Sequence, residues 1–157
     1  MRKINFLSSL ALVALLAFGA VSCETPNEPT DKPTPVVKPE DGVSTKEAYA
    51  AVDALENMKH PKNQQMLELI SDGEADEALK LCANVFEQAL EVPGRVDIKA
   101  ICNNCGAVAS CMTGSGSAVY GIFKQERDAK KAIEELKLKF KNVYLCTPEK
   151  YGVEVIE

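Results

Sequence analysis

The sequence has little positive charge. Lysine and arginine together number 18 against 23 acidic residues, which gives a formal net charge of −5 at pH 7. Proteins that grip a nucleic-acid backbone need a concentrated basic surface, because they neutralise phosphates and release counterions. The sequence therefore argues against nucleic acid as a partner.

Histidine and paired C-x-x-C motifs, the usual ligands of zinc sites, are also scarce. The one histidine, His60, precedes Pro61 in an expected loop. The pattern Cys102-Asn103-Asn104-Cys105 occurs without a second C-x-x-C. Both of its cysteines fall on the apolar stripe of an expected helix, so we interpret them as buried small residues and expect no metal site. A thiol redox site is the alternative, and it requires Cys102 and Cys105 to be exposed and reactive.

No apolar run is long enough to cross a membrane. Behind a short cationic start, the apolar stretch 6–21 falls short of the roughly 20 residues that a membrane-spanning helix needs. This stretch predicts a cleavable signal peptide over residues 1–22. Its end, Ala20-Val21-Ser22-Cys23, resembles the lipobox of bacterial lipoproteins, which predicts lipidation of Cys23 and a membrane-anchored lipoprotein. An ordinary secretory signal is the alternative.

The following segment, 23–35, is rich in proline and has no apolar periodicity. Its prolines are Pro26, Pro29, Pro33 and Pro35. Because proline lacks the N–H that helices and paired strands use, we expect an extended, lipid-anchored tether here. The remaining length suits one globular domain over residues 36–157.

Within this domain the apolar spacing predicts helices first and strands later. Helices are expected from a cap at Ser44 or Thr45, across 63–71, as one long helix across 75–90, and between Gly94 and Gly106. Residues 107–112 and 118–123 then indicate two paired strands around a glycine turn. A helix across 129–140, with a solvated Lys/Glu face, and a strand at 142–146 complete the pattern. With a short strand at 36–37, this order predicts an α+β fold: a ferredoxin-like sandwich with helices packed on a mainly antiparallel sheet.

The glycine turn carries the most chemical information in the domain. It consists of Thr113, Gly114, Ser115, Gly116 and Ser117. Alternating glycines permit positive φ and a close approach to a ligand, while backbone N–H groups and the three hydroxyls can donate to an anion such as phosphate. No Gly-Lys-Ser/Thr follows, so the turn is not a Walker A loop, and the third glycine of a Rossmann fingerprint is missing. By spacing alone, an ordinary tight hairpin turn is the alternative.

Four segments taken together resemble the GHMP kinases. Residues 112–123 are similar to the third conserved motif of that family, and 38–49, 84–87 and 106–107 agree with it in order and spacing. The resemblance is strongest to the kinases of non-mevalonate isoprenoid biosynthesis. It implies a ferredoxin-like C-terminal domain, in agreement with the topology that the periodicity predicts.

The resemblance also implies an activity that this sequence does not carry in full. GHMP kinases transfer the γ-phosphoryl group of ATP to a substrate hydroxyl, commonly with Mg²⁺. The turn 113–117 is implied to lie near the phosphate or the substrate, whereas an N-terminal domain supplies the ATP loop, the catalytic aspartate and a lysine. The signal peptide and the tether stand where those elements are expected. We therefore expect no catalytic residue in this chain, negligible activity of the chain alone, and neither ATP nor Mg²⁺ bound to it.

The expected partners are a missing N-terminal kinase half and a small phosphorylated or cytidyl ligand. The two resemblances imply different cellular locations. ATP and isoprenoid precursors are cytoplasmic, whereas a lipobox directs export. One hypothesis is a joined or truncated gene product, and a cytoplasmic location, as for the kinase family, is the alternative to a membrane-anchored lipoprotein. The competing function is a lipid-anchored extracytoplasmic module that binds a small anion.

Overall fold

The computed structural model describes residues 33–147. The predicted signal peptide, the predicted lipidation site Cys23 and most of the predicted tether lie outside the described residues. Within the described part of the chain, none of the helices combines the length and the apolar character that crossing a membrane requires.

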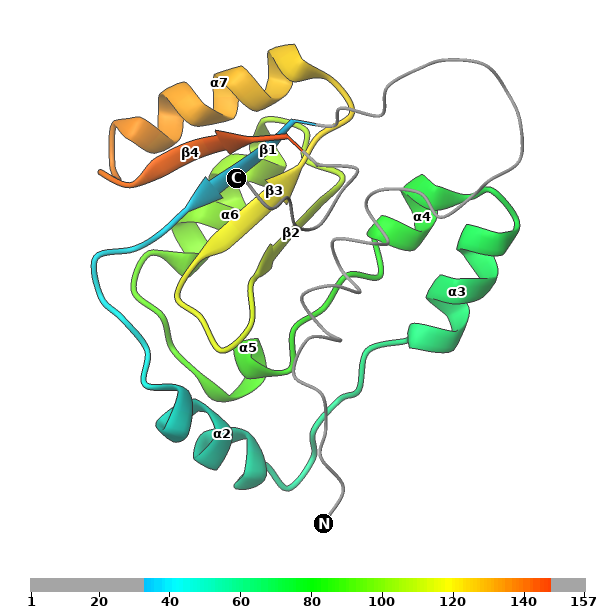
Figure 1. The fold of residues 1–157 in the computed structure, drawn as a ribbon, viewed down its shortest axis with the longest axis vertical. Coiled ribbons are helices and arrows are strands. Elements are labelled where there is room, and N and C mark those ends of the chain that lie inside the picture. Colours follow the sequence, from blue (N-terminus) through cyan, green and yellow to red (C-terminus); the bar gives the residue numbers. More distant parts are fainter. Residues whose placement is uncertain (1–32, 148–157) are drawn as a thin grey trace, which may run out of the picture.

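A four-stranded antiparallel sheet forms the centre of the domain (Figure 1). Its strands are β1 (Thr34–Val37), β2 (Ala109–Met112), β3 (Val119–Ile122) and β4 (Val143–Cys146), arranged in the order β2-β3-β1-β4. β1 therefore lies between β3 and β4, the two strands that α7 (Glu126–Lys137) connects. This split arrangement confirms the predicted ferredoxin-like α+β fold.

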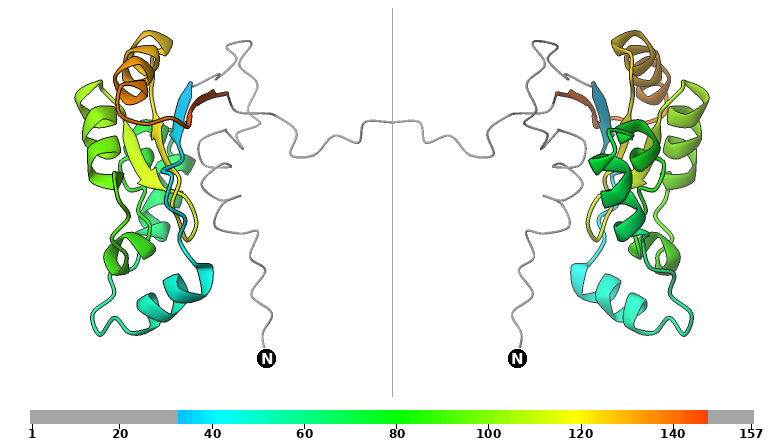
Figure 2. Two further views of the ribbon diagram at one scale, coloured as in Figure 1. Left: turned by 90° about the vertical axis from the view of Figure 1, so that its left-hand side faces the viewer. Right: turned by 90° about the vertical axis from the view of Figure 1, so that its right-hand side faces the viewer.

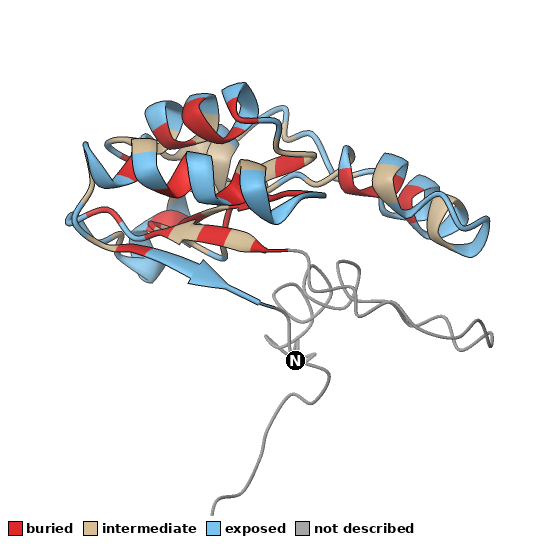
Figure 3. Cartoon of the chain, turned by 90° about the horizontal axis from the view of Figure 1, so that it is seen from above, coloured by how far each residue is buried: buried red, intermediate tan, exposed pale blue. Residues whose placement is uncertain are grey.

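Two helices cover one face of this sheet. α6 (Arg95–Asn104) and α7 pack side by side against it, as Figure 2 shows from two directions. Their apolar stripes supply Ile98, Ile101 and Leu136 to the main core, which also contains Phe123 and Val119. Figure 3 shows the buried positions of both helices turned toward the sheet and the exposed positions turned away. The lysine-rich exterior of α7 is solvated, as predicted, and carries surface ion pairs such as Lys130–Glu126 at 2.7 Å.

Among the described residues, the helices cover only part of the opposite face of the sheet. Strand alternation turns Ala109 and Ile122 away from the main core, and both pack against Leu79 at the end of α4 (Ala75–Leu79). α4 follows α3 (Asn63–Ser71), which has the predicted bounds. Across β1 and β4 this second face is more open, and Tyr144 on β4 is 56% exposed.

The predicted long helix across 75–90 is wrong. The chain forms α4, leaves helical geometry, and then forms the short α5 (Phe86–Ala89). Asn84 lies in the break, and its side-chain oxygen accepts the Phe86 N–H at 2.9 Å. Such a local bond offers the backbone an alternative to the helical ladder, and the rest of the Asn84 amide bonds elsewhere in the fold.

The expectation that the prolines exclude a paired strand is wrong at Pro35. β1 begins at Thr34, inside the predicted tether, and Pro35 is fully buried opposite Leu145 of β4. Lys38 N–H donates to Asn142 O on the β4 side, so the Pro35 nitrogen faces β3. The β1–β3 pairing covers only Val36 and Val37, and the missing N–H therefore falls beyond the end of that ladder.

The other predicted elements are confirmed with small shifts of their ends. α2 (Thr45–Asp53) is capped by Ser44, whose hydroxyl accepts the Glu47 N–H at 3.4 Å. α6 begins after Gly94 and ends before Gly106, and both glycines have positive φ, 78° and 91°.

Candidate functional site

The glycine turn connects β2 to β3 at one end of the sheet. Thr113 N–H donates to Ala118 O at 2.8 Å, and Gly116 N–H donates to Thr113 O at 3.0 Å. Gly114 and Gly116 have φ values of 55° and 96°, which favour glycine. All five predicted site residues, 113–117, thus lie together on one tight hairpin turn.

Gly116 is also fixed by its surroundings. A Cβ at this position would lie 3.0 Å from Met112 Sδ and 3.4 Å from Val43 Cγ2. Val43 immediately precedes the cap of α2, so the turn packs against the entry to that helix. Glycine at this position therefore serves both the backbone conformation and the close approach of a distant segment.

The first turn of α2 lies beside the glycine turn. Thr45 Oγ1 and Ser115 Oγ are 3.2 Å apart, although 70 residues separate them in the chain. The Tyr49 ring meets the Phe86 ring edge-on with their centroids 5.0 Å apart, which holds α2 against α5. Two groups of N–H donors, from a helix N-terminus and from a glycine turn, therefore lie close together, an arrangement that suits an anion.

Ser117 adds an unpartnered polar atom to this arrangement. The residue is only 4% exposed, and its Oγ has no hydrogen-bond partner among the described residues. A buried hydroxyl without a partner is uncommon in folded proteins, because losing its bonds to water costs free energy. Ser117 therefore leaves an unsatisfied polar atom buried beside the turn.

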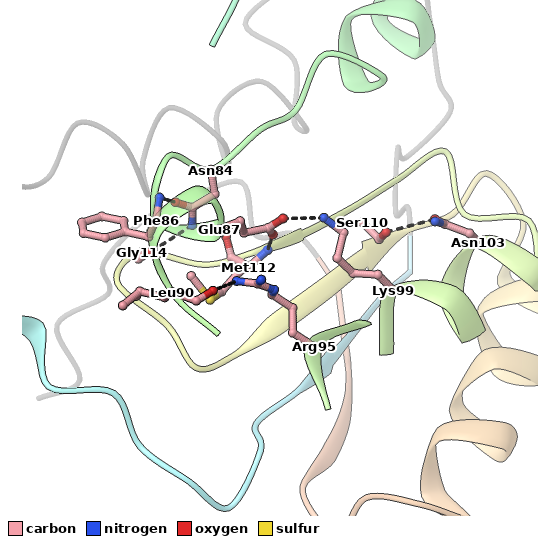
Figure 4. A network of polar contacts seen from close by, with 10 residues as sticks. All are labelled: Asn84, Phe86, Glu87, Leu90, Arg95, Lys99, Asn103, Ser110, Met112 and Gly114. Atoms are coloured by element: carbon pink, nitrogen blue, oxygen red, sulfur yellow. Dashed lines mark hydrogen bonds and ion pairs between the residues drawn. The ribbon is translucent and has the colours of Figure 1, made fainter. Parts of the chain in front are cut away.

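Asn84 holds the turn from the side of the α4–α5 break (Figure 4). Its Nδ2 donates to Met112 O at 2.6 Å and to Gly114 O at 2.8 Å. The same amide accepts the Phe86 N–H through Oδ1. One side chain thus donates to the end of β2 and to the turn, while its oxygen accepts the hydrogen bond at the start of α5.

Glu87 binds the neighbouring backbone group. Its Oε1 accepts the Met112 N–H at 2.6 Å, and its Oε2 pairs with Lys99 Nζ of α6 at 2.5 Å. Figure 4 shows Asn84, Glu87 and Lys99 converging on the end of β2. The sequence analysis used 84–87 only as part of a resemblance and assigned these residues no role. The available signal was an asparagine followed three residues later by glutamate, a pattern typical of a helix start.

The cysteines are structural, as interpreted. Cys102 and Cys105 are 0% and 7% exposed, and neither forms a disulfide. Burial raises the pKa of Cys102 to about 11 and also raises the pKa of Cys105. Thiols that stay protonated at neutral pH are poor nucleophiles, so the structure disfavours the redox alternative.

The donors at the turn fit an anion and not a cation. N–H groups and hydroxyls can bind phosphate oxygens, whereas Mg²⁺ prefers carboxylate and other oxygen ligands. Across residues 33–147, no cluster of three or more His, Cys, Asp or Glu side chains could hold a metal ion. Glu87, the carboxylate that contacts β2, is already engaged by Met112 and Lys99.

The sequence is similar to a known protein family and to kinases of bacteria. A family model described as the C-terminal part of the GHMP kinases matches residues 51–142. The 4-diphosphocytidyl-2-C-methyl-D-erythritol kinase of Clostridium botulinum is 36% identical over 118 residues, which are 74% of this chain and 42% of that protein. The kinase of the same name from Caldicellulosiruptor saccharolyticus is 38% identical over 114 residues, or 71% of this chain and 39% of that protein. The chain therefore spans about two fifths of the length of these relatives.

Solved structures share the fold. A 4-(cytidine 5'-diphospho)-2C-methyl-D-erythritol kinase matches with a TM-score of 0.58 at 24% identity, over 74% of this chain and 42% of that one. Homoserine kinase from Cytophaga hutchinsonii matches with a TM-score of 0.59 at 18% identity, over 77% and 44% of the two chains. At these identities the likeness concerns the fold alone. Because the family model covers more than half of the sequence, the chain belongs to the GHMP kinase family, of which it carries the C-terminal part.

Proposed function

We propose that this chain is the C-terminal half of a kinase for 4-diphosphocytidyl-2-C-methyl-D-erythritol, and that it requires an ATP-binding half for activity. The supporting observation is a glycine turn fixed on three sides, in a chain 36% identical to a kinase of that name. Phosphoryl transfer depends on positioning and on stabilising charge at the transferred group. The hydrogen-bond donors at the turn can position and stabilise phosphate oxygens, but they provide no general base for the acceptor hydroxyl.

In this proposal the turn contributes binding and orientation. The Ser115 N–H, which the turn's own hydrogen bonds leave unused, and the Ser117 hydroxyl donate to phosphate oxygens of the substrate or of the nucleotide. The hydroxyls of Thr45 and Ser115 border the same side. In this proposal the other half holds ATP and Mg²⁺, which supply the phosphoryl group and the counter-charge when they are bound; the described residues have no cluster of three or more His, Cys, Asp or Glu side chains for a metal ion.

Complementation tests this proposal. The full chain is mixed with a separately expressed N-terminal half of the Clostridium botulinum relative, and ATP-dependent phosphorylation of the cytidyl substrate is measured. We expect activity from the mixture and none from either half alone. Activity of the chain alone would contradict the need for a second half, and an inactive complex of two folded halves would contradict the kinase function.

The location is a separate proposal. We propose that Cys23 is lipidated and anchors the domain to a membrane, on the basis of the lipobox-like sequence. Metabolic labelling with a fatty-acid analogue should mark the wild-type chain but not Cys23→Ser. Absence of label in the wild-type chain would contradict lipidation and leave the ordinary secretory signal and the cytoplasmic location as alternatives. The joined gene product is a separate hypothesis, which sequencing the source locus across codons 25–40 tests, and an uninterrupted native reading frame would count against it.

A lipid-anchored module that binds a small anion is the second candidate function. The observation in its favour is the buried Ser117 hydroxyl, which has no partner among the described residues. A ligand that binds the folded state raises the melting temperature. Stabilisation by pyrophosphate or CDP, combined with failure of complementation, would support the module over the kinase.

A further inference from the structure

We propose that Asn84 is a positioning residue that aims the Ser115 N–H at the ligand side of the glycine turn. Its importance for phosphoryl transfer rests on the proposed kinase function, but its effect on the turn does not.

β2 is an edge strand, so half of its backbone groups lack a neighbouring strand. Thr113 N–H donates to Ala118 O on the β3 side, and Met112 therefore faces the outer edge. There its N–H is bound by Glu87 and its carbonyl by Asn84. The two side chains act in place of a missing strand, and they do so at the residue next to the glycine turn.

Asn84 also reaches into the turn itself. Its second Nδ2 bond goes to Gly114 O at 2.8 Å, and the Gly114–Ser115 peptide is trans. In a planar trans peptide the C=O and the following N–H point in opposite directions. With Gly114 O drawn toward Asn84, the Ser115 N–H must point away from it.

The Ser115 N–H has no acceptor of its own. Within residues 33–147 it donates to no backbone or side-chain oxygen, in contrast to the N–H groups of Thr113 and Gly116. Ser115 Oγ lies beside Thr45 Oγ1, at the N-terminal turn of α2. The direction that Asn84 imposes therefore turns a free backbone donor away from Asn84, on a residue whose side chain lies beside a second group of donors, where an oxygen of a phosphate or diphosphate fits.

The chemistry requires an amide at position 84. An aspartate has the same shape and still accepts the Phe86 N–H, but it places an acceptor against the carbonyls of Met112 and Gly114. Asn84→Asp thus removes the hydrogen bonds to Met112 O and Gly114 O and keeps the hydrogen bond at the start of α5. Gln88 offers a matched control, because its amide makes a similar two-point bond to Lys59 backbone, at 2.9 and 2.8 Å, away from the turn.

The test compares the full wild-type chain with Asn84→Asp and Gln88→Glu by ¹H–¹⁵N NMR. Without ligand, Asn84→Asp should shift the Ser115 amide resonance and raise exchange of the Gly116 amide with solvent about tenfold or more. Gln88→Glu should leave both signals as in the wild-type chain. If Asn84→Asp does not fold, Asn84→Ser replaces it, since a serine hydroxyl can accept the Phe86 N–H but cannot span to the turn.

Titration with inorganic pyrophosphate then separates the inference from the proposed function. We expect the Ser115 amide to shift with pyrophosphate in the wild-type chain and in Gln88→Glu, and the response to be lost in Asn84→Asp. A wild-type Ser115 resonance that ignores pyrophosphate would overturn the phosphate-facing role of the turn. Turn signals unchanged in folded Asn84→Asp, or changed equally in Gln88→Glu, would overturn the role of Asn84.

Discussion

Gly94 shows how a single hydrogen atom in place of a side chain can decide local packing. It precedes α6 with φ of 78°, and a Cβ there would lie 2.7 Å from Cε1 of Phe140. Gly73 has a similar φ of 80° but no atom within 4 Å of the Cβ position. Alanine substitution at Gly73 and at Gly94 therefore separates two losses of unfolding free energy: that from left-handed φ alone, and that from a steric clash.

Gly94→Ala should destabilise the domain more than Gly73→Ala does. Left-handed φ alone costs about 1–2 kcal/mol for a residue with a Cβ, and the clash with Phe140 should add about 1–3 kcal/mol. Urea denaturation of both variants measures the difference in unfolding free energy. Equal losses would mean that the Phe140 ring moves aside without cost.

Cys102 should make stability depend on alkaline pH. Its pKa is raised to about 11 by burial, against an ordinary value of 9.0 in the unfolded chain. Between these values the unfolded state releases a proton that the folded state keeps, so this contribution is complete below pH 9 and is lost as pH rises through 11. Two pKa units correspond to about 2–3 kcal/mol.

The difference between the wild-type chain and Cys102→Ala isolates this effect. Other groups titrate in the same range, but they do so in both proteins. The variant should lose less unfolding free energy than the wild-type chain between pH 8.5 and 11, as measured by urea denaturation at each pH. Parallel pH profiles would show that the Cys102 thiol ionises as readily in the folded state as in the unfolded one.

At the scale of elements, the end of β2 depends on Glu87. Glu87→Gln keeps an oxygen acceptor for the Met112 N–H and loses only the charge that faces Lys99. Glu87→Leu removes the acceptor and leaves the Met112 N–H, on a residue 2% exposed, without a partner. Leaving such a group unsatisfied costs about 1–3 kcal/mol, more than a partly exposed ion pair contributes.

We therefore expect Glu87→Gln to cost about 1 kcal/mol or less and Glu87→Leu about 2–4 kcal/mol. Chemical denaturation of the two variants gives the comparison. A leucine variant as stable as the glutamine variant would show that the edge of β2 finds another partner, such as water, when Glu87 is removed.

For the whole molecule, the notable surface is the open part of the sheet over β1 and β4. Tyr144 is 56% exposed and lies directly opposite Val36, which is half-buried on the central strand. Leu138, at the end of α7, is more exposed still at 86%. The two positions differ in setting, because Tyr144 shares its face with other sheet side chains whereas Leu138 caps a solvated helix.

Tyr144→Lys should lower the binding of an apolar fluorescent dye and the tendency to self-associate, whereas Leu138→Lys should change neither. Contiguous apolar surface drives such contacts, and isolated apolar side chains do not. Both substitutions should change the unfolding free energy by about 0.5 kcal/mol or less, because both side chains are exposed. Equal effects on dye binding would indicate that the sheet face is already covered.

Several features of this protein are determined by local sequence. The stripe of α7, with Ala129, Ala132 and Leu136 at helical spacing, predicts both the helix and its buried face. The glycine turn is equally local, because two glycines at alternate positions between apolar strands specify a hairpin. Four strands and two long amphipathic helices in this order leave few other topologies.

The break at Asn84 and the start of β1 at Thr34 were decided by the tertiary structure. Apolar spacing across 75–90 is helical, and it gives no sign that Asn84 bonds to groups 28 and 30 residues away. Pro35 can lie in a strand because the β3 ladder ends before its missing N–H is needed, which depends on the register of two other strands. Periodicity reports which face a residue turns to the core, whereas the partners of polar groups are fixed only when distant segments meet.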